Sequence, residues 1–265
     1  MSVAPHRTPT TRCKPAARWP ILDTIVLHRF FTKPWRALAH AHLPSQCAIC
    51  GGWPAQRVCE HCAASFAQPR PRCRSCALPL PGGATQCGQC LLHPPPLDTC
   101  IAAVDYDYPW AGVLADFKFH GDPSWAAPLA ALLRSTPWAE PAIEAADWLV
   151  PIPLTRERLG ERGFNQAQRI ALALASGKTR DDLLLRVRAT PDQHALGRAQ
   201  RLANLQAVFA VDPLRAQELS GGTVLLVDDV MTTGATLHTA AQVLRRAGAA
   251  HVSALVVARA DLRER

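Results

Sequence analysis

The clearest pattern along the chain is an apolar run that ends in two adjacent acids. Residues 224–227 are consecutive apolar residues, and Asp228 and Asp229 follow them directly. A short apolar run of this kind predicts a buried strand. After a small-residue turn, apolar residues recur at helical spacing as far as Gly248, at Leu237, Ala240, Ala241, Val243 and Leu244. We therefore expect a central strand with the acid pair at its carboxyl end, followed by an amphipathic helix.

Strand-like apolar runs and helical apolar spacing alternate over most of the remaining sequence. Strands are predicted over residues 101–108, 147–153, 183–187 and 251–258, the third of them on a weaker pattern. Helices are predicted over 110–119, about 125–133 and a segment that ends at about 174. Strands that alternate with helices indicate an α/β fold with a doubly wound, mostly parallel sheet. Ligands bind at the carboxyl edge of such sheets, where the acid pair is expected.

The turn that follows the acid pair has the composition of a site for a sugar phosphate. Gly234 allows the backbone to curl around a phosphate because it tolerates positive φ, and the threonines of 232–236 add hydroxyl donors. Two adjacent carboxylates repel each other, so they need solvent, a metal or a diol as partner, and ribose supplies a diol. The alternative is an ordinary capped helix, which needs only one such residue.

Residues 224–236 resemble the phosphoribosyl pyrophosphate signature of type I phosphoribosyltransferases. The resemblance implies that Asp228 and Asp229 hold the ribose hydroxyls and that Mg²⁺ accompanies phosphoribosyl pyrophosphate. The ligand-binding residues that it implies in this motif are Asp228, Asp229, Val230, Thr232, Thr233, Gly234, Ala235 and Thr236. It identifies no catalytic acid or base, and an acid pair locked in internal ion pairs would argue against it.

A second strand-end loop, over residues 151–158, is the candidate site for the pyrophosphate. It combines free backbone amides with arginines that can form paired hydrogen bonds to phosphate, and its candidate residues are Pro153, Arg156, Arg158 and Arg162. The alternative is a solvated basic face of the next helix. Lys118 is expected to extend from a helix end toward solvent, with a pyrophosphate contact as its alternative. The Arg-rich stretch 188–206 is predicted to be either a flap over the site or a surface loop that leads into an edge hairpin.

Cysteine spacing predicts metal binding in the first half of the chain. Eight of the ten cysteines form Cys-x-x-Cys pairs, whose two-residue gap points both thiolates at one ion: Cys47/Cys50, Cys59/Cys62, Cys73/Cys76 and Cys87/Cys90. We expect two structural zinc ions, each bound by two sequential pairs, with an interleaved pairing as the alternative. Cys13 and Cys100 fall outside the pairs and are assigned no role.

Composition favours a cytoplasmic protein that meets anions. The chain has 265 residues and a formal net charge of +8, and the excess lies in residues 1–46 and 151–206. Such basic segments attract polyanions, although a solvated surface is the plain alternative. No apolar stretch approaches the roughly 20 residues that a membrane helix needs, and no secretory signal is recognisable, so membrane insertion is not expected.

The motifs together resemble the ComF family of double-zinc-ribbon, phosphoribosyltransferase-like competence proteins. The marks are the four cysteine pairs, residues 150–154, residues 162–166, Thr190 with Gln193, Arg201 with Asn204, and the 224–236 motif. On this basis we predict a poorly ordered basic tail over 1–45, a double zinc ribbon over 46–93 and a phosphoribosyltransferase-like domain over 101–262. Residues 94–96 are read as a stiff proline linker.

Three functions remain open at this point. The resemblance implies a protein that binds phosphoribosyl pyrophosphate, or another ribose 5-phosphate ligand, and that acts in natural competence and DNA uptake. The first function is a phosphoribosyltransferase of unknown acceptor. The second is a non-catalytic factor that handles single-stranded DNA beside a competence helicase. The third is a zinc-ribbon docking factor whose other domain senses a phosphate or nucleotide. Few aromatic residues lie among the arginines of 151–206, which weakens a base-stacking role there.

Overall fold

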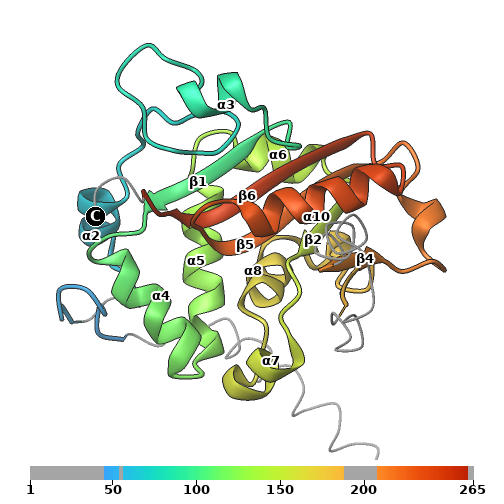
Figure 1. Cartoon of the computed structure of the whole chain (residues 1–265). Coiled ribbons are helices and arrows are strands. Elements are labelled where there is room, and N and C mark those ends of the chain that lie inside the picture. The colour runs from blue at the N-terminus through green and yellow to red at the C-terminus, as the bar shows by residue number, and fades with distance from the viewer. Residues whose placement is uncertain (1–44, 54–55, 188–207, 262–265) are drawn as a thin grey trace, which may run out of the picture. The chain divides into compact units, whose positions relative to one another are not determined.

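A computed structural model describes residues 45–53, 56–187 and 208–261, and the statements below concern these residues. Their main sheet has four strands in the order β1-β6-β5-β2 (Figure 1), all parallel. The strands are β1 (Cys100–Asp105), β2 (Trp148–Pro151), β5 (Thr223–Met231) and β6 (His251–Arg259). All carboxyl ends therefore meet at one edge, and the acid pair lies on an interior strand, as predicted.

Helices cover both faces of this sheet, which confirms the doubly wound fold (Figure 1). On one face lie α4 (Trp110–Phe119), α5 (Ala126–Arg134), α6 (Ala139–Ala145) and α8 (Gln166–Ala175); on the other lies α10 (Ala235–Arg246). Short 3₁₀ segments occur at Pro123–Trp125, Ser176–Lys178 and Ala216–Leu219. Because both faces are covered, β5 and β6 can be nearly continuous apolar runs.

The main differences from the sequence prediction lie in short elements. The loop expected over 151–158 is shorter, because the helix α7 (Arg156–Arg162) begins within it. The helix α6 was not predicted. Strand β5 continues through both acids to Met231 rather than ending at them. The strands β3 (Leu184–Arg186) and β4 (Phe209–Val211) pair antiparallel in a separate two-stranded sheet instead of joining the main one. The stretch predicted as a flap and the tail up to residue 44 lie outside the described residues.

The cysteine-rich segment packs on both sides of the edge strand β1. It contains two short helices, α2 (Glu60–Phe66) and α3 (Gly88–Leu92). Its second half belongs to the apolar cluster of the α10 face, through residues such as Cys73 and Leu78. Its first half packs on the opposite cluster through Ile49, Val58 and Ala67. The segment therefore shares its core with the sheet and does not form a separate one.

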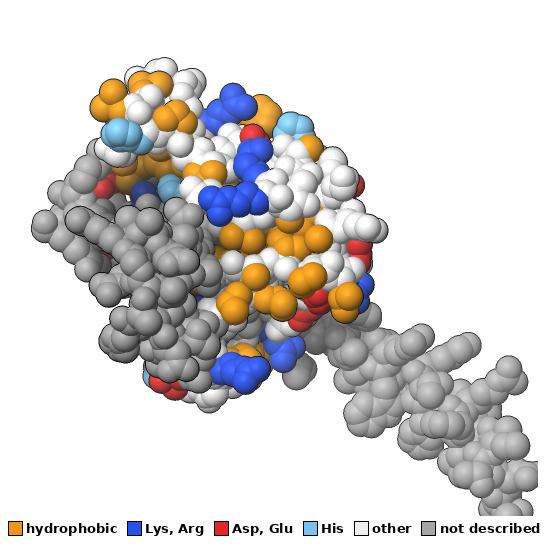
Figure 2. Space-filling model, turned by 45° about the vertical axis from the view of Figure 1, so that its right-hand side comes forward, with side chains coloured by type: hydrophobic (Ala, Val, Ile, Leu, Met, Phe, Trp, Pro, Cys, Tyr) orange, Lys and Arg blue, Asp and Glu red, His pale blue; other side chains and the backbone are white. Residues whose placement is uncertain are grey.

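The proline segment 94–96 is attached to the domain that follows it. The carbonyl of Pro96 accepts a hydrogen bond of 3.0 Å from Nε of Arg245, and the adjacent Leu97 is buried. Figure 2 shows one face of the molecule, on which basic, acidic and apolar side chains are interspersed rather than sorted into one charged stripe. In the described ranges, no helix combines the length and the apolar character that crossing a membrane requires.

Candidate functional site

The acid pair lies near the carboxyl end of β5. Asp229 is 7% exposed, and Asp228 is half-buried. The backbone N–H of Asp229 donates a 2.9 Å hydrogen bond to Oδ1 of Asp228. Burial and the neighbouring charge of Asp229 nevertheless raise the pKa of Asp228 to about 8. A group that brings hydrogen-bond donors or positive charge to this carboxylate would therefore bind favourably.

Lys118 does not extend into solvent as expected but reaches the acid pair. Its Nζ lies 3.0 Å from Oδ1 of Asp229, and its side chain is only 16% exposed. Lys118 lies in the last turn of α4, and the ion pair brings this end of the helix to the acid pair. This ion pair engages one oxygen of one acid. The acid pair is therefore partly neutralised rather than locked, because Asp228 has no ion pair among the described residues.

The turn after β5 leads directly into the N-terminus of α10. Gly234 has φ of +82° and forms the N-cap of α10, where it offers no side chain to block the helix N-terminus. Thr232, Thr233 and Thr236 are exposed around it. The Thr233 hydroxyl accepts a 3.3 Å hydrogen bond from the backbone N–H of Ala235. A helix N-terminus with a left-handed glycine before it is a favourable place for an anion.

Three arginines gather around the second loop. The positive charge of Arg162 acts on Asp228, and its Nη1 donates to Oε1 of Gln166 at 3.1 Å. Arg186 of β3 donates from Nη1 to the carbonyl of Pro153 at 3.3 Å. Burial lowers the pKa of Arg186, and the nearby charge of Arg158 adds to this effect while Asp228 opposes it. Of these groups, Arg162 and Arg186 lie within electrostatic range of Asp228, whereas Pro153 and Arg158 are connected to it only through Arg186.

Arg156 and Arg186 do not lie as the sequence predicted. Arg156 was predicted with the others, but it is exposed at the start of α7, and no described contact brings it to the acid pair. Arg186 was not predicted as a site residue. It comes from a three-residue strand whose pairing depends on residues far along the chain, so no local pattern marks it.

The eight paired cysteines form two quartets in the sequential pairing. The quartets are Cys47, Cys50, Cys59 and Cys62, and Cys73, Cys76, Cys87 and Cys90, and the sulfurs of each lie within 4.8 Å of one another. Tetrahedral zinc with Zn–S bonds of about 2.3 Å requires sulfurs about 3.8 Å apart. The distances Cys50–Cys59 and Cys76–Cys87 are both 3.8 Å. Each quartet can therefore hold one zinc ion, and the interleaved alternative is excluded.

The thiols of each quartet cannot all ionise on their own near neutral pH. Burial raises the pKa of Cys76 to about 11. For Cys73, the backbone N–H groups of Cys87, Ser75 and Cys76 outweigh burial and lower the pKa to about 7. A divalent cation removes this conflict because it stabilises all four thiolates together. The donor set is closed, with four sulfurs and no open position, as in structural sites.

A cavity of about 370 Å³ lies where the cysteine-rich segment meets the end of β1. It is lined by residues from 65–72 and 104–110, including Tyr108 and Trp110. Its two arginines, Arg70 and Arg72, both pair with Asp105. Since these charges are already neutralised, the cavity is a weaker anion site than the turn after β5.

Most of the chain aligns with known proteins, and its C-terminal part matches a known domain family. The family described as "Phosphoribosyl transferase domain" matches residues 162–264, which contain β5, the turn and α10. "DNA utilization protein YhgH" of Salmonella typhimurium is 35% identical over 206 residues, which cover 74% of this chain and 87% of the relative. "Competence protein F" of Haemophilus influenzae is 29% identical over 197 residues, 72% of this chain and 85% of that protein. The chain belongs to the ComF family.

The Bacillus relative agrees with this assignment. "Competence protein ComFC" of Bacillus subtilis is 35% identical over 147 residues, which cover 55% of this chain and 58% of that protein. As a ComF family member, the chain combines a phosphoribosyltransferase-like α/β domain with two cysteine quartets. The printed names of the relatives refer to DNA use and competence.

Proposed function

We propose that this ComF protein binds phosphoribosyl pyrophosphate with Mg²⁺ at the carboxyl edge of the sheet and transfers its phosphoribosyl group to an acceptor. The observation that carries the proposal is the arrangement at the end of β5. An acid pair with a raised pKa at Asp228 is followed within six residues by an open helix N-terminus behind Gly234. Along this one segment, the acid pair matches the ribose diol, and the N-terminus of α10 that follows it matches the 5-phosphate.

In this proposal each part of the ligand meets a different group. Asp228 and Asp229 accept hydrogen bonds from the ribose hydroxyls, and the turn 232–236 donates to the 5-phosphate. The loop at Pro153 with Arg158, Arg162 and Arg186 faces the pyrophosphate. When bound, Mg²⁺ would neutralise charge on the departing pyrophosphate. The protein's own contribution is alignment and positive charge around the leaving group.

Lys118 is compatible with this arrangement because its ion pair is partial. It contacts Oδ1 of Asp229, which leaves Oδ2 for a ribose hydroxyl. The ammonium has three N–H donors, so it can keep Asp229 and still offer a donor to a phosphate oxygen. In the absence of ligand, the lysine compensates a buried carboxylate that would otherwise be unpaired.

The test is calorimetric titration of phosphoribosyl pyrophosphate and Mg²⁺ into the wild type and into the double variant Asp228→Ala/Asp229→Ala. We expect saturable binding by the wild type and no measurable binding by the variant. The variant should remain folded, as judged by circular dichroism and zinc content. Equal affinity of the two proteins would move the ligand site away from β5.

A substitution in the turn tests the phosphate part separately. Gly234→Ala would place a Cβ against the Met231 methyl and 2.9 Å from the His238 ring, at a φ of +82°. We expect about tenfold weaker binding of ribose 5-phosphate, since the turn must open to relieve the strain. Gly248→Ala is the matched control, because Gly248 has φ of +106° at the other end of α10. It should lower thermal stability without changing affinity; equal affinity losses in both variants would contradict the assignment.

We further propose that each cysteine quartet holds one structural zinc ion and that the protein acts in the use of incoming DNA, as the names of its relatives suggest. Because those names refer to DNA rather than to a transferase, a non-catalytic role with single-stranded DNA and a helicase partner is the second candidate. Release of pyrophosphate with an acceptor supports the enzyme. Binding of single strands that weakens steeply with salt, without pyrophosphate release, supports the second candidate.

A further inference from the structure

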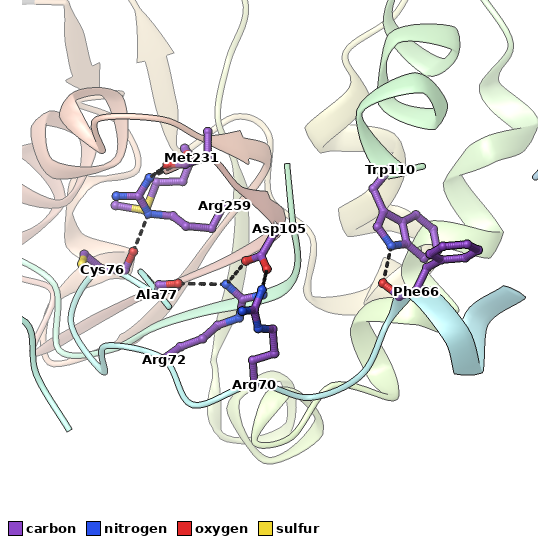
Figure 3. Close-up of polar contacts among 10 residues, drawn as sticks. Phe66, Arg70, Arg72, Cys76, Ala77, Asp105, Trp110, Met231 and Arg259 are labelled. Carbon is purple, nitrogen blue, oxygen red and sulfur yellow. Dashed lines mark hydrogen bonds and ion pairs between the residues drawn. The ribbon is translucent and has the colours of Figure 1, made fainter. Parts of the chain in front are cut away.

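One buried arginine connects the second cysteine quartet to the turn that follows β5. Arg259 is the last residue of β6 and is only 7% exposed. Its Nε donates to the carbonyl of Cys76 at 2.8 Å, and its Nη1 donates to the carbonyl of Met231 at 3.2 Å (Figure 3). Nη1 also donates to the carbonyls of Thr232 and Ala260. Neutral carbonyls from three segments thus surround one guanidinium.

The position of Arg259 follows from the sheet. Strand register places it directly beside Met231 on one side and beside Asp105 on the other. A buried guanidinium must have its N–H donors satisfied, because a charged group that is buried without partners is strongly destabilising. The carbonyls of Met231 and Thr232 are therefore drawn toward a fixed charge. This fixes the backbone immediately before Gly234.

The opposite side of the guanidinium is held by a cysteine knuckle. Cys76 is a member of the second quartet, and the next residue, Ala77, has a left-handed φ of +56°. The carbonyl of Ala77 accepts from Arg72 at 3.2 Å, and Arg72 also pairs with Asp105 at 2.7 Å. The carbonyls of Cys76 and Ala77 in this turn point away from the quartet. Arg259 binds the first and Arg72 binds the second (Figure 3).

The residues beneath the turn depend on the same region. Sγ of Cys100 donates to Sδ of Met231 at 3.5 Å, so this cysteine is not the bystander that its spacing suggested. The terminal methyl of Met231 and the ring of His238 fill the space under Gly234. Burial and, in addition, the charge of Arg259 lower the pKa of His238, which shows that the guanidinium also lies close to the first turn of α10.

The first quartet has no comparable connection among the described residues. Its neighbours Ile49 and Val58 pack on the cluster of the opposite face, and Arg57 pairs with Asp122 at the start of a 3₁₀ segment. Hydrogen bonds from the cysteine-rich segment to the turn after β5 run through Cys76 and Arg259.

We propose that Arg259 is a positioning residue that transmits the metal-bound conformation of the second quartet to the 231–234 turn, so that loss of the second zinc, and not of the first, weakens ligand binding. The ligand-binding part of this proposal rests on the proposed function. The conformational part does not, because the hydrogen bonds between the knuckle and the turn exist without ligand. Loss of the second zinc frees the Cys76 carbonyl, and the guanidinium then no longer holds the turn in one place.

The two quartets provide a matched pair of variants. Cys59 and Cys87 are equivalent ligands, since each is the N-cap of the short helix in its own quartet. The test compares Cys59→Ser with Cys87→Ser in the full chain. The quantities to measure are zinc content, hydrogen exchange of the amides of residues 232–237, and affinity for phosphoribosyl pyrophosphate with Mg²⁺. Each variant should lose one zinc. Only Cys87→Ser should show about tenfold faster exchange at 232–237 and about tenfold weaker affinity.

A second pair of variants leaves every metal ligand intact. Arg259→Gln removes the bridge, whereas Arg72→Gln removes an arginine that binds the same knuckle but not the turn. We expect faster exchange at 232–237 in Arg259→Gln alone, and little further change when Cys87→Ser is added to it. If Cys87→Ser is unfolded, the comparison of Arg259→Gln with Arg72→Gln alone decides whether Arg259 positions the 231–234 turn. Equal exchange at 232–237 within either folded pair would overturn the proposal.

The measurements separate this proposal from the function on which it partly rests. If the wild type fails to bind phosphoribosyl pyrophosphate, the proposed function fails, while the exchange data still decide the role of Arg259. If the wild type binds the ligand but Arg259→Gln and Arg72→Gln bind it equally well, the proposed function stands and the positioning role is wrong.

Discussion

Replacing Asp228 with asparagine is expected to make the protein more stable and to abolish binding of phosphoribosyl pyrophosphate. Burial and the charge of Asp229 raise the pKa of Asp228 to about 8, so the ionised form is unfavourable in the folded state. One pKa unit corresponds to about 1.4 kcal/mol. Because solvent reaches this half-buried side chain and screens the repulsion, we expect a gain of about 1–2 kcal/mol in the free energy of unfolding at pH 7.5.

The gain should depend on pH in a direction that the raised pKa fixes. Between pH 4 and 8 the unfolded chain loses the Asp228 proton while the folded protein keeps it. The unfolded state then binds fewer protons, so the contribution of Asp228 to stability decreases as the pH rises through this window. The asparagine variant lacks this decrease. The difference in melting temperature between the two proteins should therefore grow from pH 5 to pH 8 and then level off.

Thermal unfolding followed at a series of pH values measures this effect, and Asp229→Asn is the matched control. Asp229 pairs with Lys118, so its replacement leaves a nearly buried ammonium without its partner and should lower stability instead. Both variants should lose ligand binding. A stabilising effect of Asp229→Asn, or a difference for Asp228→Asn that shrinks toward pH 8, would show that the two acids are not in the electrostatic situation described here.

The site elements that the sequence predicted are those that lie within one continuous segment. The run 224–236 contains the strand, the acid pair, the glycine turn and the start of α10, so local periodicity and turn chemistry were sufficient. The cysteine spacing was also local and led to the correct pairing. Helix α7 has seven residues, which is less than two full turns, and none of its residues is buried. It therefore has no apolar periodicity by which a helix could be predicted. Its start was therefore taken for part of the loop.

The groups that complete the site come from distant positions, which no periodic pattern connects. Lys118 at the end of α4 pairs with Asp229 of β5, although their spacing in the sequence gives no indication of this contact. Arg186 reaches Pro153 only because β3 pairs with β4 away from the main sheet. Arg259 comes directly after the predicted strand 251–258, where an arginine is ordinarily expected in solvent. Strand register instead places it between the knuckle and the turn.

The relation of the cysteine-rich segment to the sheet was equally invisible in the sequence. Too few apolar residues occur in 46–92 for an independent core, and metal binding was the expected substitute. The structure adds that Cys73, Cys87 and Cys90 belong to the same apolar cluster as Leu226 of β5. The second quartet is thus part of the core of the α/β domain, and its metal should matter for the stability of both.

Removal of zinc is expected to destabilise the whole described core and not the cysteine-rich segment alone. A structural zinc in a small module contributes on the order of 10–16 kcal/mol to its folding. Without the metal, four buried thiols remain in contact, and burial holds the pKa of Cys76 at about 11. Since this quartet packs directly on the sheet, we expect chelation to lower the melting temperature by about 10 °C or more, in one cooperative transition.

Differential scanning calorimetry before and after chelation, with zinc content measured in parallel, tests this expectation, and readdition of zinc should restore the original transition. Cys73→Ser and Cys47→Ser separate the two quartets, because both cysteines are almost fully buried but only Cys73 belongs to the apolar cluster of the α10 face. Cys73 is surrounded by the α10-face cluster, so its replacement should lower the melting temperature of the sheet, whereas Cys47→Ser should loosen mainly the first half of the segment. If chelation instead produced two separate transitions with the sheet melting as before, the shared core would not be cooperative, and the second quartet could not act on the 231–234 turn through Arg259.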